Sequence, residues 1–429
     1  MPRARRLGWV SGVVVAGVML RVWLLWLAPR WGYPWDQFGN MGMGLAAVEH
    51  GVLGVYALRH EELPTVRGVV VGANGVAGIV EQRIETPPNY PPLSMLALWA
   101  QAWVSSRVLV PLEVNTRGAR LLGAVVPGIG EVLVLWGIVG LVRALGGGRH
   151  AIAVGASAGW LFPPLALNAW FWGQNDALVL APAVGAVACM ARGRWRASGA
   201  LVAVAALVKP QGVLLAVPLL FAAAAGGERA AAPRRLATVL VSGALAVLVL
   251  TAPWMATSGL AWVGRSYLAS AARYSQATLH AYNVWYLDAL LHGRVLDGST
   301  SLAGLARDTW GALLLVLAAV AAGVLAWRRP SAEAGVLFAA LWVWSAFLWP
   351  TRVHERYVLY CAPLVIALAA VRPRFWPCVV GLALVGVGAH TWNVWQRAPR
   401  PALEWLLTAT SLASYAWAMV AASVPGERA

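Results

Sequence analysis

The sequence predicts an all-α fold, a polytopic bundle of about twelve transmembrane helices. Of its 429 residues, 60% are hydrophobic and only 12% are charged, whereas soluble domains carry about 25% charged residues. The mean hydropathy is +0.67, and many windows hold the roughly 20 apolar residues that a spanning helix needs. No long alternation of polar and apolar residues is present, which argues against an outer-membrane barrel.

The apolar segments divide the chain into spans and loops within a single domain, residues 1–429. The first segment, Val10–Leu27, is longer than the apolar core of a signal peptide and lacks a clear cleavage site, so we expect it to be retained. The expected spans are residues 9–28, 92–110, 120–142, 151–170, 177–190, 197–225, 236–256, 309–327, 331–349, 358–371, 375–395 and 401–423.

The basic residues account for the net charge of +16 without a nucleic-acid partner. They occur in short runs between apolar segments, which is the positive-inside pattern, strengthened by anionic membrane lipids. With both termini on the cytoplasmic side, long loops at 29–91 and 257–308 and a short loop at 350–357 fall outside.

The topology in the middle of the chain stays open. Residues 177–190 are short for a hydrophobic core of about 30 Å, and residues 197–225 are interrupted at Lys209-Pro210-Gln211. If the arginine run 192–196 lies inside, as its charge suggests, either residues 177–190 or a neighbouring segment is re-entrant, or the parity of the spans fails. If 197–225 is one kinked span, that run lies outside and breaks the charge rule. Broken helices are tolerated where they line a cavity enclosed by protein.

The first outer loop begins with an acidic residue among aromatic side chains. Asp36 follows Trp35 and is one of only five aspartates in the chain. A carboxylate just outside the bilayer can act as general base toward a substrate hydroxyl; the plainer alternative is a helix N-cap or a loop ion pair. Residues 37–53 favour an interfacial helix, and the Gly/Val-rich residues 64–80 are expected to be flexible.

Polar residues also border the next apolar segments. Tyr90 precedes two prolines that suit the first turn of a helix, where a missing donor costs nothing. The run 171–176 joins two apolar stretches and holds Trp172, Gln174 and Asp176. Asp176 would make an ordinary N-cap for the following helix, and that explanation competes with a functional one.

Lys209 is the only lysine in the chain and lies with Gln211 inside an apolar stretch. An ionisable residue in such a stretch is a functional candidate, and a lysine suits an anionic phosphate. A snorkelling lysine is the alternative, weakened by the long apolar flanks. Arg21 and Glu131 also fall within spans and are candidates for the same cavity.

Two later loops carry clusters suited to ligand binding. The first of these loops holds Tyr282, Asn283 and Trp285. Aromatic and amide side chains of this kind can bind a sugar face or a prenyl chain, and they can equally anchor a loop at the membrane interface. Arginine binds phosphate in bidentate fashion, and the loop between two late spans holds Arg352, His354, Glu355 and Arg356. The alternative for this loop is a self-neutralising surface segment.

In their order along the chain, these motifs resemble those of the GT-C glycosyltransferases, polytopic enzymes that use polyprenyl-phosphate sugars as donors. The similarity covers residues 10–395 and is nearest to bacterial GT-C mannosyltransferase-like proteins and to the dolichyl-phosphate-glucose-dependent glucosyltransferases of the ER. The motifs are the first-loop acid, Tyr-Pro-Pro-Leu, Trp-Gly-Gln-x-Asp, Lys-Pro-Gln, Asn-x-Trp and His-Glu-Arg. Each is weak alone, but six in one order are together specific.

The resemblance implies a GT-C-type bundle with interfacial helices in the first outer loop, and it assigns roles. Asp36 matches the presumed base for the acceptor. The residues implied for the donor's phosphate and sugar are Lys209, Gln211, Arg352, His354, Glu355 and Arg356. Those implied for the sugar or the acceptor are Gln37, Tyr90, Trp172, Gln174, Asp176, Tyr282, Asn283 and Trp285.

The implied reaction is the inverting transfer of a hexose or pentose, with mannose or glucose favoured, to a glycan, glycolipid or protein acceptor. Many family members carry a second acid close to the first, but here Gln37 and Phe38 follow Asp36. We therefore expect no metal and no cofactor, with a divalent ion left open. The Ala/Gly/Arg-rich, Lys-poor composition indicates a GC-rich bacterial genome, hence a plasma membrane and not the ER. The predicted outer loops, one of which carries Asp36, place the active site on the outer face of that membrane.

Two other classes of protein compete with this interpretation. A transporter or flippase of a lipid-linked sugar would share the cavity and the basic cluster, but transporters often show paired halves, and the sequence has no such repeat. A structural subunit of a membrane complex would use the polar clusters for contacts. Product formation from a labelled donor separates the three.

Overall fold

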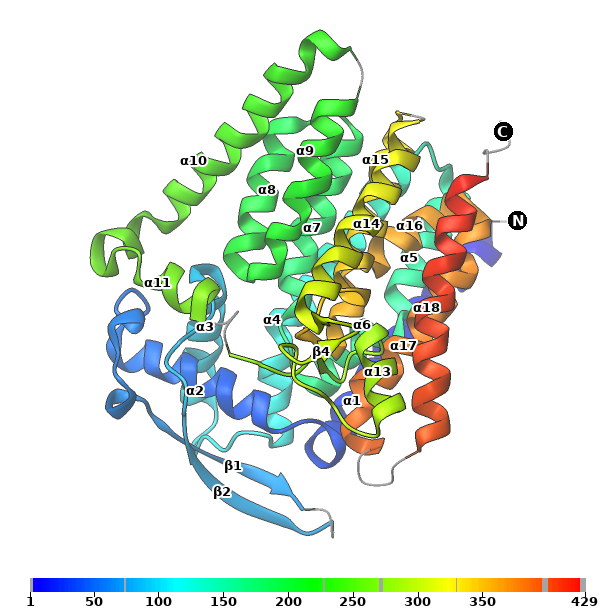
Figure 1. Ribbon diagram of the computed structural model, residues 1–429. Helices are drawn as coiled ribbons and strands as arrows, with labels where there is room; N and C mark the ends of the chain where they lie inside the picture. Colours follow the sequence, from blue (N-terminus) through cyan, green and yellow to red (C-terminus); the bar gives the residue numbers. More distant parts are fainter. Residues whose placement is uncertain are drawn as a thin grey trace.

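The structure, a computed structural model, describes residues 3–72, 75–226, 228–269, 273–328, 330–395 and 400–424, and it is largely helical, as predicted (Figure 1). Its α-helices are α1 (Arg3–Trp31), α2 (Trp35–His50), α3 (Pro92–Val108), α4 (Arg117–Ala144), α5 (Arg149–Leu161), α6 (Pro163–Ala166), α7 (Asp176–Ala191), α8 (Trp195–Val208), α9 (Ala216–Ala225), α10 (Ala232–Ser258), α11 (Ala261–Val263), α13 (Val284–His292), α14 (Arg307–Trp327), α15 (Ala332–Leu348), α16 (Ala362–Val371), α17 (Trp376–Trp395) and α18 (Pro401–Ser423).

The chain also has short helices of other kinds. Two are π-helices, η3 (Leu167–Trp172) and η6 (Gly264–Ala269). The others are 3-10 helices: η1 (Val55–Ala57), η2 (His60–Glu62), η4 (Pro210–Leu215), η5 (Arg229–Ala231), η7 (Glu355–Tyr360) and η8 (Pro373–Phe375).

Small sheets accompany the bundle, so the all-α prediction was incomplete. Within the described residues they are an antiparallel hairpin of β1 (Thr65–Val71) and β2 (Ala77–Arg83), a parallel pair of β3 (Thr278–Leu279) and β6 (Val353–His354), and an antiparallel pair of β4 (Ser301–Leu302) and β5 (Leu305–Ala306). The segment 64–80 was expected to be flexible, but residues 65–71 and 77–80 within it lie in the strands of the first hairpin. Its valines favour strands, and Val66 is buried in a core cluster with α2 and α3.

Five of the described helices are long and apolar enough to cross a membrane: α1, α4, α10 with its preceding turn, α14 and α18. A sixth span results if the bent pair α5 and Pro163–Trp172 counts as one. The helices α7, α8 and α15 and the segment Pro210–Ala225 are apolar but shorter. The predicted number of twelve spans is therefore not confirmed, whereas a polytopic helical bundle is.

The expected span 92–110 does not cross the bundle. Its helix, α3, is followed by Asn115, whose side-chain amide donates to the carbonyl oxygens of Pro29 at 3.2 Å and Val69 at 2.7 Å. Both ends of α3 therefore lie with the first outer loop, beside the end of α1. Its buried apolar side chains pack in one cluster with α2: Met95, Leu98 and Ala102. Apolar composition alone cannot distinguish a helix buried against protein from one buried in lipid.

Residues 197–225 form a hairpin and not a kinked span. The chain leaves α8 at Lys209, whose backbone is extended (φ −145°, ψ 147°), and returns through η4 and α9. Trp195 at the start of α8 and Gly226 after α9 line one small cavity with Arg235. Pro210 helps to end α8 because it disfavours helical geometry in the residue before it. The arginine run 192–196 therefore lies at the same end of the bundle as the turn between α9 and α10.

Gly212 permits the tight turn of this hairpin. A Cβ atom at Gly212 would overlap the backbone of Ala205 in α8. We expect Gly212→Ala to destabilise the protein by about 1–3 kcal/mol, as overpacking does, and to lower its melting temperature in detergent. Gly12→Ala on α1 is the control, since a Cβ there has open space around it. Equal melting temperatures for the two variants would contradict this close approach.

One end of the bundle gathers the arginine-bearing turns. Arg235 lines the small cavity at this end. Arg372 forms an ion pair with Glu333 at 2.8 Å, and Trp417 donates to the carbonyl oxygen of Arg374 at 2.9 Å. The turns α7–α8, α9–α10 and α14–α15 meet around the same small cavity. Figure 1 shows the turn between α9 and α10 at this end of the bundle, whereas α2 and the β1–β2 hairpin lie at the opposite end.

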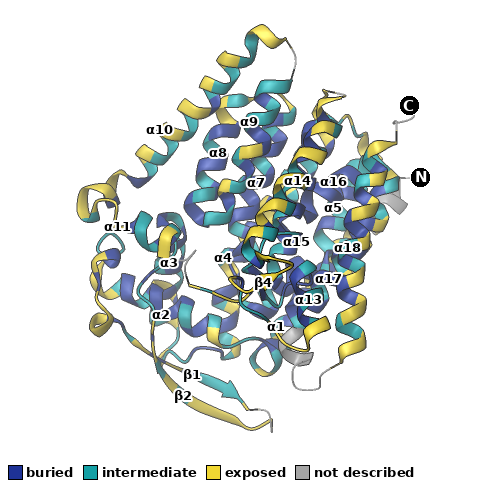
Figure 2. Cartoon of the chain, viewed as in Figure 1, coloured by how far each residue is buried: buried dark blue, intermediate teal, exposed yellow. Residues whose placement is uncertain are grey.

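The outer helices expose apolar side chains along their length. Met19 on α1 is 62% exposed, Val249 on α10 is 70% exposed and Leu317 on α14 is 65% exposed. Figure 2 shows exposed residues along α10 and buried ones on α7 and α8. An apolar surface of this extent fits a lipid environment.

Candidate active site

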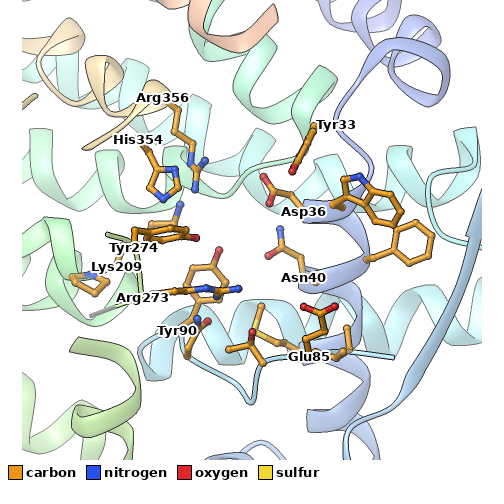
Figure 3. Close-up of a pocket in the computed structure, with 18 of the residues that line it drawn as sticks. Tyr33, Asp36, Asn40, Glu85, Tyr90, Lys209, Arg273, Tyr274, His354 and Arg356 are labelled. Carbon is orange, nitrogen blue, oxygen red and sulfur yellow. The ribbon is translucent and has the colours of Figure 1, made fainter. Parts of the chain in front are cut away.

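A cavity of about 740 Å³ lies beside α2, at the end of the bundle opposite the arginine-bearing turns. Figure 3 shows residues that line it. Its walls come from α2, the loop before α3, the turn at Lys209, the second long loop and the loop before α16. Seven of the predicted site residues line it: Asp36, Tyr90, Lys209, Gln211, Arg352, His354 and Arg356. Four more lie directly behind and contact these residues: Trp172, Gln174, Asp176 and Glu355. Segments far apart in the sequence thus build one site.

Asp36 is held by two neutral donors and is not the N-cap of its helix. It is the second residue of α2, and the N-cap position belongs to Pro34. One carboxylate oxygen, Oδ2, accepts hydrogen bonds from the indole of Trp172 at 2.7 Å and from the side-chain amide of Gln174. Because both donors are neutral, they orient the carboxylate without neutralising its charge. The other oxygen, Oδ1, takes no part in these bonds.

Buried polar side chains fix the backbone of the segment that carries Trp172 and Gln174. Gly173 has a left-handed backbone (φ 82°) that ends the π-helix η3. Arg120 donates to the carbonyl oxygens of Phe171 at 2.7 Å and Trp172 at 3.1 Å. Gln37 donates to the carbonyl oxygens of Trp172 and Gly173 at 3.1 and 3.0 Å. Gln37 therefore supports this segment from behind and does not line the cavity.

Asp176 is the fully buried centre of a polar cluster. One oxygen accepts from Lys209 Nζ at 2.5 Å and from the Tyr360 hydroxyl at 2.7 Å, and the other accepts from the Asn168 amide at 2.9 Å. Arg356 Nε lies 3.7 Å from that second oxygen. The carboxylate binds side chains and does not cap α7. Small residues place it here: a Cβ on Gly130 of α4 would lie 2.8 Å from the backbone of α7, so the two helices pack closely.

The late loop supplies the opposite wall of the cavity. Arg356 forms an ion pair with Glu355 at 2.8 Å, and His354 Nδ1 lies 3.6 Å from the same carboxylate. Strand β6 pairs with β3 at Thr278–Leu279, which fixes the loop against the second long loop. Arg352 has a left-handed backbone (φ 62°) and forms an ion pair with Asp308 at 2.5 Å.

Electrostatic shifts keep this wall in one charge state near neutral pH. Burial opposes ionisation of Glu355, but the Arg356 cation and the His354 hydrogen bond outweigh it and lower its pKa to about 2. Burial, together with the Arg356 cation, lowers the pKa of His354 below its usual 6.5. At pH 7 Glu355 is therefore an anion that neutralises Arg356, and His354 is a neutral imidazole.

The structure does not bring every predicted residue to the cavity. Tyr282 is buried with Tyr286 (ring centroids 5.0 Å apart), Asn283 caps α13, and Trp285 donates to the carbonyl oxygen of Trp349 at 2.6 Å. These residues support the second long loop from within the core. Arg21 and Glu131 form a buried ion pair at 2.8 Å, also away from the cavity lining.

Several residues that line the cavity were not among the predicted site residues: Tyr33, Asn40, Glu85, Arg273 and Tyr274. Asn40 lies four residues after Asp36 on α2, so helical spacing could have placed both on one face. Glu85 lies just before the proline run that ends at Pro92. Glu85 and Arg273 lie in polar loops, and no feature of the sequence separated them from ordinary surface positions. Among the described residues, no three His, Cys, Asp or Glu side chains gather in a way that could hold a metal ion.

Comparisons with known proteins find similarity at the level of structure. No protein-family model and no curated protein matches the sequence. The chain is similar to the solved structure of ArnT from Cupriavidus metallidurans in the apo state, with 15% identity, 97% of this chain and 77% of that chain covered, and a TM-score of 0.50. It also matches the archaeal oligosaccharyltransferase AglB from Archaeoglobus fulgidus, at 15% identity, 98% and 56% coverage and a TM-score of 0.43. The likeness to ArnT shows a shared fold.

Proposed function

We propose that this chain, which has the fold of the GT-C superfamily of membrane glycosyltransferases, transfers a sugar from a polyprenyl-phosphate donor to an acceptor. One observation carries the proposal. A single cavity holds an oriented carboxylate, Asp36, on one wall and the basic side chains of Lys209, Arg352 and Arg356 on the other. Such a cavity suits a reaction that takes a proton from an acceptor and releases an anionic phosphate.

In the proposed reaction, Asp36 accepts the proton of an acceptor hydroxyl. The hydroxyl oxygen attacks the anomeric carbon of the sugar while the bond from that carbon to the phosphate oxygen breaks. The configuration at the anomeric carbon inverts, and the polyprenyl phosphate leaves with the bonding electrons. Fixed N–H donors on the wall that carries Lys209, Arg352 and Arg356 stabilise the charge that develops on this leaving group.

The position of the arginine-bearing turns supports an outward-facing active site. Arginine-bearing turns mark the cytoplasmic side of membrane proteins, and the cavity lies at the other end of the bundle (Figure 1). We therefore place the reaction at the outer face of the plasma membrane, with both chain ends in the cytoplasm. The motif resemblance favours a hexose, mannose or glucose, over a pentose, and the acceptor is a glycan, a glycolipid or a protein.

Purified protein in lipid vesicles, given a radiolabelled polyprenyl-phosphate mannose or glucose, tests the function. We expect label to move from the lipid to an added glycan, glycolipid or peptide acceptor, with polyprenyl phosphate as the second product. Movement of the intact donor across the bilayer without product would contradict the proposal and favour a transporter of lipid-linked sugars. Neither product nor movement would favour a structural subunit.

We also expect transfer to proceed without a divalent metal. The sequence lacks a second acid next to Asp36, and basic side chains line the cavity where phosphate charge would be neutralised. Treatment with EDTA should leave the initial rate of transfer within about twofold of the untreated rate, because no step depends on a Lewis acid. A loss of activity that added Mg²⁺ or Mn²⁺ restores would contradict this expectation.

A further inference from the structure

The cations that line the cavity are not equally available to a new anion. The part of the chain that the structure describes contributes four: Lys209, Arg273, Arg352 and Arg356. Three already face a carboxylate, as Lys209–Asp176 at 2.5 Å, Arg352–Asp308 at 2.5 Å and Arg356–Glu355 at 2.8 Å. Among the described residues, Arg273 has no carboxylate within ion-pair distance; its guanidinium carbon lies 5.7 Å from the ring centre of Tyr274.

Burial restricts the paired cations further. The side chain of Asp176 is 0% exposed and that of Lys209 is 5% exposed. If Lys209 left Asp176 to bind a phosphate, the buried carboxylate would lose its nearest cation, which is unfavourable in a low-dielectric site. The pair of Arg356 with Glu355 is buried in the same way, with side chains 12% and 4% exposed. These four side chains together carry no net charge.

Arg273 is exposed and reaches the cavity from the second long loop. Its neighbour Tyr274 packs edge to face on His354, with ring centres 5.0 Å apart, so the loop is attached to the wall that carries Arg356. Figure 3 shows Arg273 extending into the cavity beside Tyr90, with Asp36 across from it. An unpaired, partly solvated guanidinium can bind a phosphate in bidentate fashion without first breaking a buried ion pair.

We propose that Arg273 binds the phosphate of the polyprenyl-phosphate donor directly, while the neutral cluster of Lys209, Asp176, Glu355 and Arg356 shapes the wall behind it. This inference rests on the proposed function, because it names a residue for the donor of that reaction. Arg352 is a secondary contact, since its pair with Asp308 is about one-third exposed, with side chains 37% and 33% exposed, and such pairs are weak.

The test compares Arg273→Gln and Arg273→Lys with Arg294→Gln, an exposed arginine of the same loop that lies outside the cavity lining. Two quantities are measured for each: the KM for the labelled donor, and the protection of the protein against thermal unfolding by a short-chain polyprenyl monophosphate. We expect Arg273→Gln to raise the donor KM and to weaken monophosphate binding, each by roughly tenfold to a hundredfold. Arg273→Lys should recover part of both, and the acceptor KM should stay unchanged.

The outcomes separate this inference from the proposed function. If the parent protein transfers sugar and Arg273→Gln binds the monophosphate as tightly as Arg294→Gln, the inference is wrong and the function stands. If the parent protein transfers no sugar, the binding measurement still decides, because it needs no turnover. An equal loss in the two variants would also overturn the inference, since it would indicate a general effect of loop charge.

Discussion

Replacing Asp36 with Asn is expected to lower the rate of sugar transfer about 10²- to 10⁴-fold, the usual contribution of a general base. Asn is nearly isosteric and its amide oxygen can still accept hydrogen bonds from Trp172 and Gln174. The variant therefore loses the proton acceptor while it keeps the local packing. The effect should fall mainly on kcat, because the substrate's other contacts in the cavity remain.

The control is Glu49→Gln, which makes the same change from acid to amide at the exposed end of the same helix. It should transfer sugar at the parent rate. Both variants should unfold at the parent melting temperature in detergent. A folded Asp36→Asn protein that keeps its transfer rate would remove Asp36 as the base, and Glu85, the other carboxylate lining the cavity, would become the candidate.

Replacing Asp176 with Ala is expected to destabilise the protein by about 3–5 kcal/mol and to abolish transfer. The carboxylate is 0% exposed and binds Lys209, Tyr360 and Asn168. Its removal leaves the Lys209 cation buried without its partner, which is the costly case for a buried ion pair. Unfolding is measured in detergent, and the melting temperature and the denaturant midpoint of the variant are compared with those of the parent protein.

A double variant identifies the cause of this loss. Asp176→Ala with Lys209→Met removes both charges, so it should be more stable than Asp176→Ala alone. Glu113→Ala is the matched control for an exposed pair, because Glu113 and Arg67 have side chains 24% and 49% exposed; it should cost at most about 1 kcal/mol. If the double variant is less stable than Asp176→Ala alone, an unpaired lysine is not the reason for the loss.

The predicted site residues that stood out most clearly in the sequence were polar groups in apolar surroundings. Asp36, Lys209 and Asp176 stood out because a charge in an apolar chain is costly unless it has a partner or a function. The structure places all three at one cavity. Arg273 and Glu85 did not stand out, because each lies in a polar loop where composition marks neither of them.

The errors of the sequence analysis have a common physical origin. Residues 92–110 have the composition of a span, yet α3 buries its apolar side chains against α2. The segment 197–225 was ambiguous because hydropathy does not show the direction of the chain after Lys209, whereas the structure shows a hairpin. Tyr282, Asn283 and Trp285 resembled a binding cluster, but they lie in the core of their loop.

Composition by itself determined that this is a polytopic helical membrane protein, because transfer into lipid depends on the apolar content of each segment. It also marked the acid, the lysine and the basic loop, and their order indicated a glycosyltransferase of the GT-C type. Only the tertiary structure decided which charges neutralise one another. The pairs Lys209–Asp176 and Arg352–Asp308 join distant segments, so their energies depend on packing that no local pattern contains. That pairing leaves Arg273 as the cation most available for the donor's phosphate.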